Sequence, residues 1–307
     1  MDELSDWVDE WAESLRTGNV TDATIVVYVR GARQFTQWLA ATHPEASLAD
    51  VDRRTCQRWL GKLADDGLSE ATRRVRGISL RLFLGYVASE PDSGLEQNPA
   101  EGLELPVPKA PPVPVISDDD LGTLLRSMDG ASFVDRRDTA IIRVLLDTGC
   151  RRGELAGLDV EDVELRHGEM MIRHAKGGKA RVVPFGNRTT LALRKYLRAR
   201  TRRGVRAEAG PLFIPTRVTA GREARMTGGG VRDMLARRCK AAGLGHIHPH
   251  QLRHTWAHDM LASGAGESDV ERLAGWSTPL MVRRYGNSVA DARARDAARR
   301  LGRGDRV

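Results

Sequence analysis

A proline-rich segment about one third of the way along the chain divides the sequence into two parts. Five of the ten residues from 105 to 114 are prolines. Proline fixes its own φ angle and has no amide hydrogen to donate. Such a segment therefore cannot lie inside a helix or a central strand, and it favours a stiff, extended connector. In this 307-residue chain we expect two domains, residues 1–105 and 117–307, joined by a linker over residues 106–116.

Composition narrows the classes of protein that the chain can belong to. Hydrophobic residues make up 41% of the sequence, which is enough for packed cores and excludes a disordered chain. No run of about 18 uncharged apolar residues is present, so we expect no membrane-spanning helix. The start of the chain, residues 1–6, is acidic and lacks the apolar core of a secretory signal. Three widely spaced cysteines exclude a disulfide framework and favour the cytoplasm.

The first part has a helical pattern throughout. Apolar residues recur at steps of three and four, beginning with Leu4, Trp7, Trp11 and Leu15. Ser69 is a candidate N-cap for a fourth helix. The apolar stripe expected on this helix is Val75, Ile78, Leu82, Phe83 and Tyr86.

Four arginines on this fourth helix, Arg73, Arg74, Arg76 and Arg81, are predicted to lie off its apolar stripe. Two interpretations stay open for them. They are either a solvated charged face or a row of guanidinium groups placed on phosphates, and the overall net charge of +7 is compatible with both.

The second part combines helices with a short β region. Ser117 followed by three aspartates is typical of a helix start, and an apolar helix through residues 141–146 is predicted to stop at Gly149. Residues 163–185 have a β-like pattern, interrupted by Gly177-Gly178, a pair that suits a tight hairpin turn. Helices resume from Leu191 onward. The predicted fold class is mainly α, with a mostly α second domain that contains a small antiparallel sheet.

Five histidines in residues 246–258 raise the possibility of a metal site. With Pro249 at the first helical position, His250, His254 and His258 follow one another at one-turn intervals. The residue after His250 is Gln251, however, where the zinc-protease motif requires glutamate. The alternative is a set of histidines on a partly exposed helix. We therefore infer no metal cofactor. Gly228–Gly230 is not followed by the Lys-Ser/Thr of a phosphate-binding loop, so we infer no ATP either.

Four short segments of the second part, taken together, indicate an active site that needs no metal. They are Thr148–Leu155, Lys176–Arg181, His248–Thr255, and Leu273–Ser277 followed by Arg283–Tyr285. In their order and spacing, these segments resemble the tyrosine recombinase family of phage integrases and Xer-type strand exchangers. The resemblance covers nearly the whole chain and implies an N-terminal helical core-binding, SAM-like domain.

The resemblance also assigns roles to individual residues. Arg151 and Arg253 would bind the scissile phosphate, because a guanidinium stays ionised and directs paired donors onto phosphate oxygens. Tyr285 would attack the phosphorus, with His250 as general base. Lys176 would protonate the leaving 5′ oxygen, with Lys179 as a rival for that role. Trp276 would supply an indole N–H donor, and Glu154 is the supporting acidic residue. Residues expected to contact DNA are Arg73, Arg74, Arg76, Arg81, Lys179 and Arg181.

The expected partner is duplex DNA carrying recombination sites, and the family resemblance implies a homotetramer assembled on two sites. The basic tail over residues 290–301 is expected to form a helix that docks on a neighbouring protomer or contacts DNA. The chain starts almost directly with the predicted core-binding helices, so we expect no separate arm-site domain and short recombination sites.

Departures from the Xer pattern favour the integrase of a phage or another mobile element. Trp276 stands where Xer proteins usually have histidine, and Met281–Arg284 replaces their Thr-Thr-Gln run. The alternatives are an Xer-like resolvase of chromosome or plasmid dimers, a type IB topoisomerase-like enzyme, and a catalytically silent DNA-binding protein.

Overall fold

The structure, a computed structural model, forms two compact units, residues 1–111 and 112–307. It describes residues 2–18, 20–108, 114–173, 180–204, 209–216, 225–276, 282, 294–295 and 298–306. The mainly α fold class predicted from the sequence is confirmed, and so is the small antiparallel sheet. Among the described helices, none has the length and apolar character needed to span a membrane.

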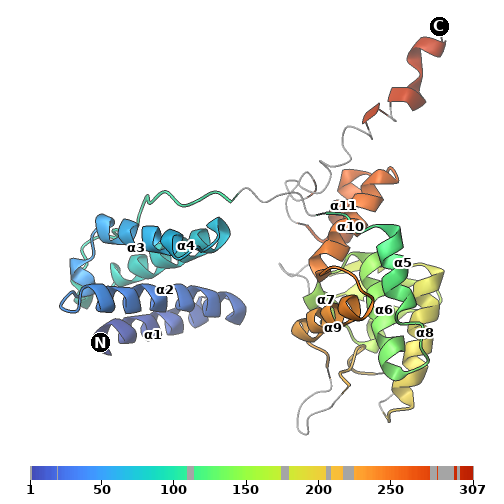
Figure 1. The fold of residues 1–307 in the computed structure, drawn as a ribbon, viewed down its shortest axis with the longest axis horizontal. Helices are drawn as coiled ribbons and strands as arrows, with labels where there is room; N and C mark the ends of the chain where they lie inside the picture. The colour runs from blue at the N-terminus through green and yellow to red at the C-terminus, as the bar shows by residue number, and fades with distance from the viewer. Residues whose placement is uncertain are drawn as a thin grey trace. The chain divides into compact units, whose positions relative to one another are not determined.

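The N-terminal unit is a set of four α-helices (Figure 1). They are α1 (Asp2–Thr17), α2 (Asp22–Thr42), α3 (Arg53–Asp65) and α4 (Glu70–Val87), with short 3-10 turns at Leu48–Asp50 and Pro91–Ser93. Helix α2 packs against both α1 and α4. The predicted cap at Ser69 is confirmed, since its hydroxyl accepts a hydrogen bond from the Thr72 amide at 3.3 Å. The core contains an edge-to-face pair, Phe35 and Trp59, with ring centroids 5.4 Å apart.

The apolar stripe predicted for α4 is partly wrong. Val75 and Leu82 are exposed, whereas Leu80, Phe83 and Val87 are buried. The buried face of α4 also includes Arg76, which lies one turn before Leu80. The sequence pattern was ambiguous because apolar residues occur on nearly every side of this helix, and packing against α2 selects one of those sides.

The second unit contains seven α-helices among its described residues: α5 (Asp118–Arg126), α6 (Phe133–Thr148), α7 (Arg152–Ala156), α8 (Asn187–Thr201), α9 (Gly228–Ala241), α10 (Pro249–Ala262) and α11 (Glu267–Ala274). Its sheet consists of β1 (Val163–Glu164), β2 (Glu169–Ile172) and β3 (Arg181–Pro184), antiparallel in that order. Met170 is paired with Val163 on one side and with Val183 on the other. The 3-10 turns are Val160–Asp162 and Arg303–Arg306.

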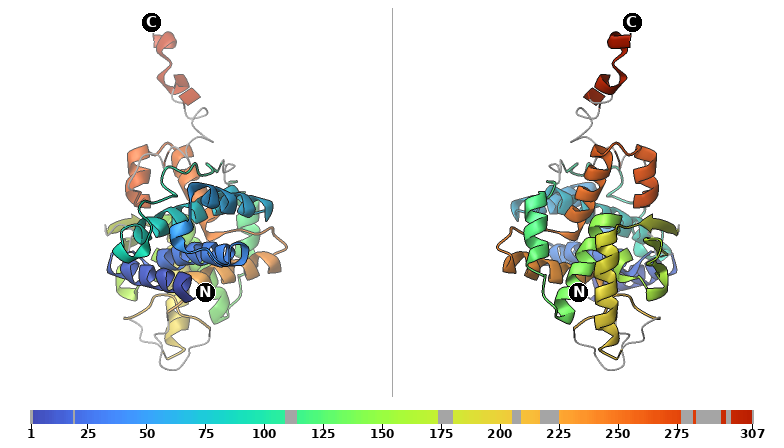
Figure 2. Two further views of the ribbon diagram at one scale, coloured as in Figure 1. Left: turned by 90° about the vertical axis from the view of Figure 1, so that its left-hand side faces the viewer. Right: turned by 90° about the vertical axis from the view of Figure 1, so that its right-hand side faces the viewer.

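Helix α6 is the centre of this unit. It packs against α8 and against α10, and Figure 1 and the right view of Figure 2 show α8 beside α6. Ser117 caps α5 by accepting from the Asp120 amide at 3.1 Å, which confirms the predicted helix start. The turn expected at Gly177-Gly178 lies outside the described residues.

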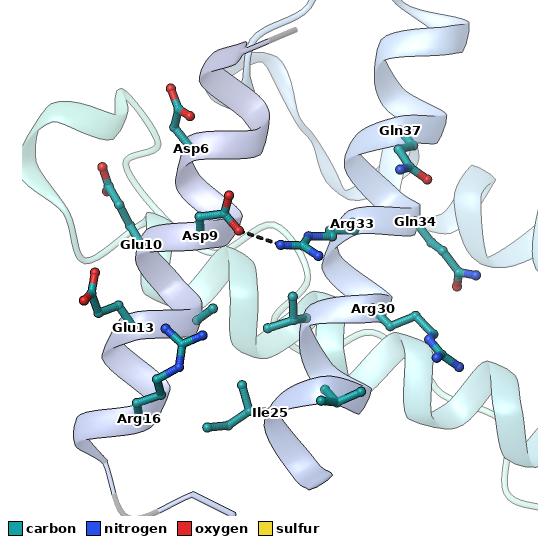
Figure 3. A pocket seen from close by; sticks show the side chains of 13 residues that line it. Asp6, Asp9, Glu10, Glu13, Arg16, Ile25, Arg30, Arg33, Gln34 and Gln37 are labelled. Carbon is teal, nitrogen blue, oxygen red and sulfur yellow. Dashed lines mark hydrogen bonds and ion pairs between the residues drawn. The ribbon is translucent and has the colours of Figure 1, made fainter. Parts of the chain in front are cut away.

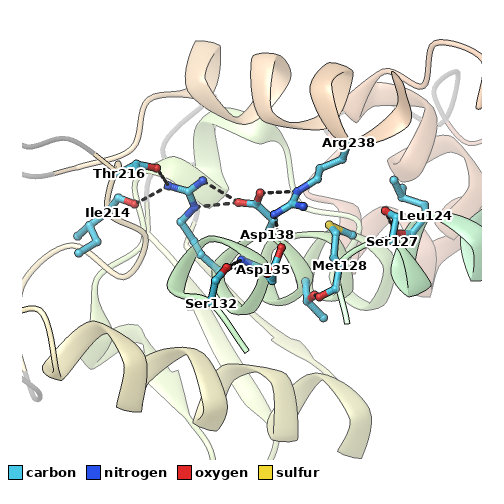
Figure 4. A network of polar contacts seen from close by, with 11 residues as sticks. Leu124, Ser127, Met128, Ser132, Asp135, Asp138, Ile214, Thr216 and Arg238 are labelled. Atoms are coloured by element: carbon cyan, nitrogen blue, oxygen red, sulfur yellow. Dashed lines mark hydrogen bonds and ion pairs between the residues drawn. The ribbon is translucent and has the colours of Figure 1, made fainter. Parts of the chain in front are cut away.

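A buried polar network joins α6 to α9. Asp138 accepts two hydrogen bonds from Arg137, at 2.9 and 2.7 Å, and one from Arg238 Nε at 2.8 Å. Arg238 also donates to Asp135 at 2.8 Å, and Figure 4 shows it between the two carboxylates. Because every charge in this network has a partner, it fixes α6, which ends shortly before Arg151, against α9.

Candidate active site

The turn between α6 and α7 places Arg151. Helix α6 ends at Gly149, whose φ of +56° is left-handed, and the chain turns through Cys150 into the N-cap of α7. Arg151 is that N-cap residue. Its backbone amide and its Nη1 both donate to Glu154, each at 2.8 Å. Its side chain remains one third exposed, so the guanidinium is oriented from one side and open on the other.

Glu154 is the centre of a buried ion-pair cluster. Only 2% of its side chain is exposed, and Arg181 from β3 donates to both carboxylate oxygens, at 3.2 and 2.7 Å. Burial acts to raise the pKa of Glu154, but the hydrogen bonds from Arg181 and Arg151 outweigh it, so the pKa is lowered. The carboxylate therefore stays ionised between its two arginines.

Arg253 lies on the first turns of α10, whose N-terminus begins at Pro249 as predicted. Its side chain is buried and donates to the Gly149 carbonyl at 2.5 Å and to the Ala274 carbonyl at 2.7 Å. The guanidinium carbon lies 5.2 Å from the Trp276 ring centroid, a cation–π contact. Burial, followed by repulsion from Arg151, lowers the pKa of Arg253 to about 10, so it is still charged at neutral pH.

The C-terminal end of α11 is held by arginines from three different elements. The carbonyl of Leu273 accepts from Arg181 Nε at 2.7 Å, and the next carbonyl, that of Ala274, accepts from Arg253. The Gly275 carbonyl is 3.5 Å from Arg151 Nη2. The last carbonyls of a helix lack partners within the helix and carry partial negative charge, so cations stabilise this end.

A pocket of about 460 Å³ opens beside these arginines. Its lining residues are Cys150, Arg151, Arg152, Arg232, His248, Pro249, His250 and Arg253. None of these carries a carboxylate, so the pocket can attract and orient an anion. Cys150 is not a candidate nucleophile, because burial raises the pKa of its thiol to about 11.

A larger hollow, of about 1020 Å³, lies between α1 and α2 of the N-terminal unit (Figure 3). Its lining mixes carboxylates with arginines, and Arg33 forms an ion pair with Asp9 at 2.6 Å. Such a mixed lining does not suit a polyanion. We therefore place the candidate active site in the pocket at Arg151 and Arg253, although it is the smaller of the two.

Comparison with protein families decides the identity of the chain. Residues 114–291 match the phage integrase family, and residues 8–90 match the N-terminal SAM-like domain of phage integrases. The chain belongs to the tyrosine recombinase family. It is a site-specific tyrosine recombinase, in an enzyme class that cleaves and rejoins DNA.

Individual proteins support the assignment. The recombinase is 34% identical over 262 residues to tyrosine recombinase XerC of Corynebacterium efficiens, which covers 84% of this chain and 78% of the relative. It is 28% identical to XerC of Oceanobacillus iheyensis over 95% of this chain and 94% of that one. Two solved structures share the fold, each with a TM-score of 0.72. They are the Tn1549 transposon integrase in complex with transposon right end DNA (19% identity, 97% of this chain and 99% of that chain) and the XerH recombinase bound to palindromic difH substrate (21% identity, 96% and 84%).

The structure of the recombinase brings four of the six expected catalytic residues to one region. Arg151, His250 and Arg253 line the pocket, and Trp276 lies against Arg253. His250 is exposed, on the first turn of α10. Lys176 and Tyr285, as well as Lys179, lie outside the described residues.

The three histidines considered as metal ligands differ in their surroundings. His250 is exposed, His254 is buried and His258 is half-buried. Within the described ranges, no group of three or more His, Cys, Asp or Glu side chains is arranged to hold a metal ion.

The arginines of α4 are largely engaged within the N-terminal unit. Arg76 is buried, contrary to the expected position off the apolar stripe, and donates to the Val27 carbonyl at 3.2 Å. Arg74 donates to the Pro106 carbonyl at 3.1 Å, and Arg81 donates to two carbonyls of the segment that follows α4. Arg74 and Arg81 therefore anchor the segment that leads to the linker, and Arg76 ties α4 to α2.

Arg181 also points inward, whereas the sequence suggested contact with DNA. The alternation of β3 contained the signal for this orientation. Val183 is buried and Val182 is exposed, so Arg181 shares the inner face of the strand with Val183. The sequence obscures this orientation because Arg181 closely follows Lys176 and Lys179 in one basic run.

Proposed function

We propose that this recombinase cuts duplex DNA by attack of the Tyr285 hydroxyl on one backbone phosphorus. The bond between phosphorus and the 5′ oxygen breaks as the bond to tyrosine forms, which gives a 3′-phosphotyrosyl linkage and a free 5′ hydroxyl. That hydroxyl then attacks the linkage on the partner strand. Because the phosphodiester energy is kept in the covalent intermediate, rejoining needs no external energy source.

The observation that carries this proposal is the convergence of Arg151 and Arg253 on one pocket whose lining lacks carboxylates. Two guanidinium groups would neutralise the charge that builds up on the non-bridging oxygens, and losing one such donor is expected to cost about 10²–10³ in rate. Tyrosine ionises near pH 10, so it needs a base, and His250 in the same pocket would take its proton. Lys176 would protonate the departing 5′ oxygen, and Trp276 would add its indole N–H.

The domain roles follow from the same assignment. Residues 1–105 would form the core-binding domain, residues 106–116 the linker and residues 117–307 the catalytic domain. Solved relatives include a transposon integrase with transposon end DNA and XerH with its difH substrate, which supports duplex DNA as the partner here. We further propose a homotetramer on two sites, with the basic tail, which includes Arg295, Arg299 and Arg300, docked on a neighbouring protomer.

The biological role that we propose is integration of a phage or other mobile element. It rests on Trp276 and on the Met281–Arg284 run, both of which depart from the Xer pattern. Xer-like dimer resolution is the second candidate, favoured by the 34% identity to XerC of C. efficiens. Recombination between the flanks of the gene would support integration, whereas exchange only at a chromosomal dimer-resolution site would support the second role.

The test of the chemistry is a nicked suicide substrate that lets the cleaved 5′ fragment diffuse away. We expect a covalent protein–DNA band with the natural chain and none with Tyr285→Phe at equal DNA binding. DNA binding without any covalent band in the natural chain would instead indicate a catalytically silent binder. A two-site plasmid assay separates the topoisomerase-like alternative, because only a recombinase produces exchanged junctions.

A further inference from the structure

Arg181 joins β3 to α7 and α11, two helices that lie next in sequence to the expected catalytic residues Arg151 and Trp276. It is the first residue of β3, five positions after Lys176 in sequence, and its guanidinium binds both Glu154 on α7 and the Leu273 carbonyl near the end of α11. We propose that Arg181 is a positioning residue of the strand-cleavage site, which sets Arg151 through Glu154 and sets the end of α11 through the Leu273 carbonyl. This proposal rests on the function proposed above.

The geometry uses the specific shape of the arginine side chain. Its two terminal nitrogens bind the two oxygens of Glu154, at 3.2 and 2.7 Å, while Nε donates sideways to Leu273 at 2.7 Å. A planar guanidinium makes these bonds at the same time, whereas a lysine ammonium is a single point charge. Only 8% of the Arg181 side chain is exposed, so its donors are used inside the protein.

Arg181 positions Arg151 indirectly, because both arginines bind the same Glu154 carboxylate. The same carboxylate accepts from the Arg151 amide and from its Nη1. Without Arg181, the carboxylate is free to tilt, and the partly exposed guanidinium of Arg151 loses its fixed orientation. A misplacement of about 1 Å in a catalytic group can cost about 10²-fold in rate.

Through Leu273, Arg181 acts on the chain that leads to Trp276 and, nine positions further on in sequence, to Tyr285. Gly275 has a left-handed φ of +64°, and a Cβ built there would lie 2.8 Å from Arg181 Nη1. The guanidinium is therefore packed directly against the turn that ends α11. Arg253 holds the neighbouring carbonyl, that of Ala274, so two arginines fix this turn from two sides.

The experiment measures single-turnover formation of the covalent complex on the nicked substrate for the natural chain and for Arg181→Gln. We expect a loss of about 10²-fold in rate, with DNA affinity and its salt dependence unchanged. The matched control is Arg173→Gln, directly after β2, because Arg173 is 58% exposed and pairs with Asp162 instead of Glu154. It should cleave at the natural rate. A fall in affinity and in salt slope for Arg181→Gln would mean that Arg181 contacts DNA, and would overturn the proposal.

Two further variants keep the test decisive if Arg181→Gln folds poorly. Arg181→Lys leaves a cation opposite Glu154 but cannot also hold Leu273, so we expect it to fold and still to cleave more slowly than the natural chain. Cleavage at the natural rate would overturn the proposal. The double variant of Glu154→Gln and Arg181→Gln should be no slower than the slower single variant, because both act through one unit. Multiplying losses would show that they act separately.

A substrate with sulfur in place of the bridging 5′ oxygen tells whether Arg181 acts through the expected general acid, Lys176, or through Glu154 and Leu273. A thiolate leaves without protonation, so this substrate bypasses the general acid. Arg181→Gln should remain slow on it, because the arginines and the nucleophile are still misplaced. Recovery to the natural rate would show that Arg181 acts only through Lys176, the expected general acid, and would overturn the proposal. If the natural chain forms no covalent complex on any substrate, the proposed function itself fails, which is a different outcome from equal rates for Arg181→Gln and the natural chain.

Discussion

The carboxylate of Glu154 lies between the guanidinium groups of Arg151 and Arg181, with Arg151 Nη1 at 2.8 Å and Arg181 Nη2 at 2.7 Å. The single negative charge of Glu154 is therefore paired with two positive charges, those of Arg151 and Arg181. The cluster keeps an excess of positive charge and leaves Arg151 partly open to the pocket. A phosphate group that enters the pocket would supply the missing negative charge.

Glu154→Gln should destabilise the catalytic unit by about 3–5 kcal/mol at neutral pH, because it leaves the buried charge of Arg181 unpaired. The folded-state pKa of Glu154 is lowered, so its contribution to stability is fully present above the unfolded value of about 4.3. That contribution is lost as the pH falls through the lower folded value. Urea denaturation of both proteins between pH 7 and pH 3 should show the difference in unfolding free energy shrinking at the acid end. A constant difference would contradict the ionised cluster.

Gly149→Ala should be strongly destabilising, by more than about 2 kcal/mol. The residue has a positive φ, and a Cβ there would lie 2.2 Å from the Trp256 ring. The same change displaces the carbonyl that holds Arg253, so cleavage of the suicide substrate should fall as well. Gly153→Ala is the control, because nothing lies within 4 Å of its Cβ position. It should be neutral or slightly stabilising in thermal unfolding, and equal midpoints for the two variants would refute this account of the turn.

Asp138→Asn should cost about 3–5 kcal/mol, because it removes the buried partner of Arg137 and of Arg238 (Figure 4). Asp233→Asn removes a partner of an exposed arginine, Arg232, and should change stability by about 1 kcal/mol or less. Denaturation curves of the two variants give the comparison directly. If both lost the same stability, the network between α6 and α9 would not have the structural role assigned to it.

Tyr196→Phe should destabilise the protein by about 1–3 kcal/mol. The Tyr196 hydroxyl donates to the Leu212 carbonyl at 2.9 Å and accepts from the Ile214 amide at 3.1 Å, and both groups lose a buried partner. Burial raises the pKa of Tyr196 to about 12, so the stability from its neutral form is complete below pH 10 and is lost as the pH rises toward 12. An ultraviolet titration should show this phenol ionising last among the described tyrosines, and ionisation near pH 10 would contradict its burial.

Local signals in the sequence predicted much of the fold. Ser69 and Ser117 begin helices as expected, and Gly149 ends α6, because capping chemistry depends on residues only a few positions apart. The buried face of α4 was mispredicted because tertiary packing, not local pattern, decided between several apolar sides. The family resemblance named Arg151, His250 and Arg253, which line one pocket in the structure, and their catalytic roles stay a prediction.

The contacts behind the pocket could not be predicted in the same way. The carbonyls of Leu273 and Ala274 have no side-chain signature, and their partners come from β3 and α10. Bonds to backbone atoms between distant elements depend on how those elements pack. The alternation of β3 was the one sequence signal that Arg181 faces inward, and the nearby lysines obscured that signal.

The arginine-held end of α11 makes this helix part of the support of the pocket. Three consecutive carbonyls, those of Leu273, Ala274 and Gly275, accept from Arg181, Arg253 and Arg151 respectively. A chain whose α11 is not seated would therefore lose a backbone partner of three arginines at once, two of which, Arg151 and Arg253, line the pocket.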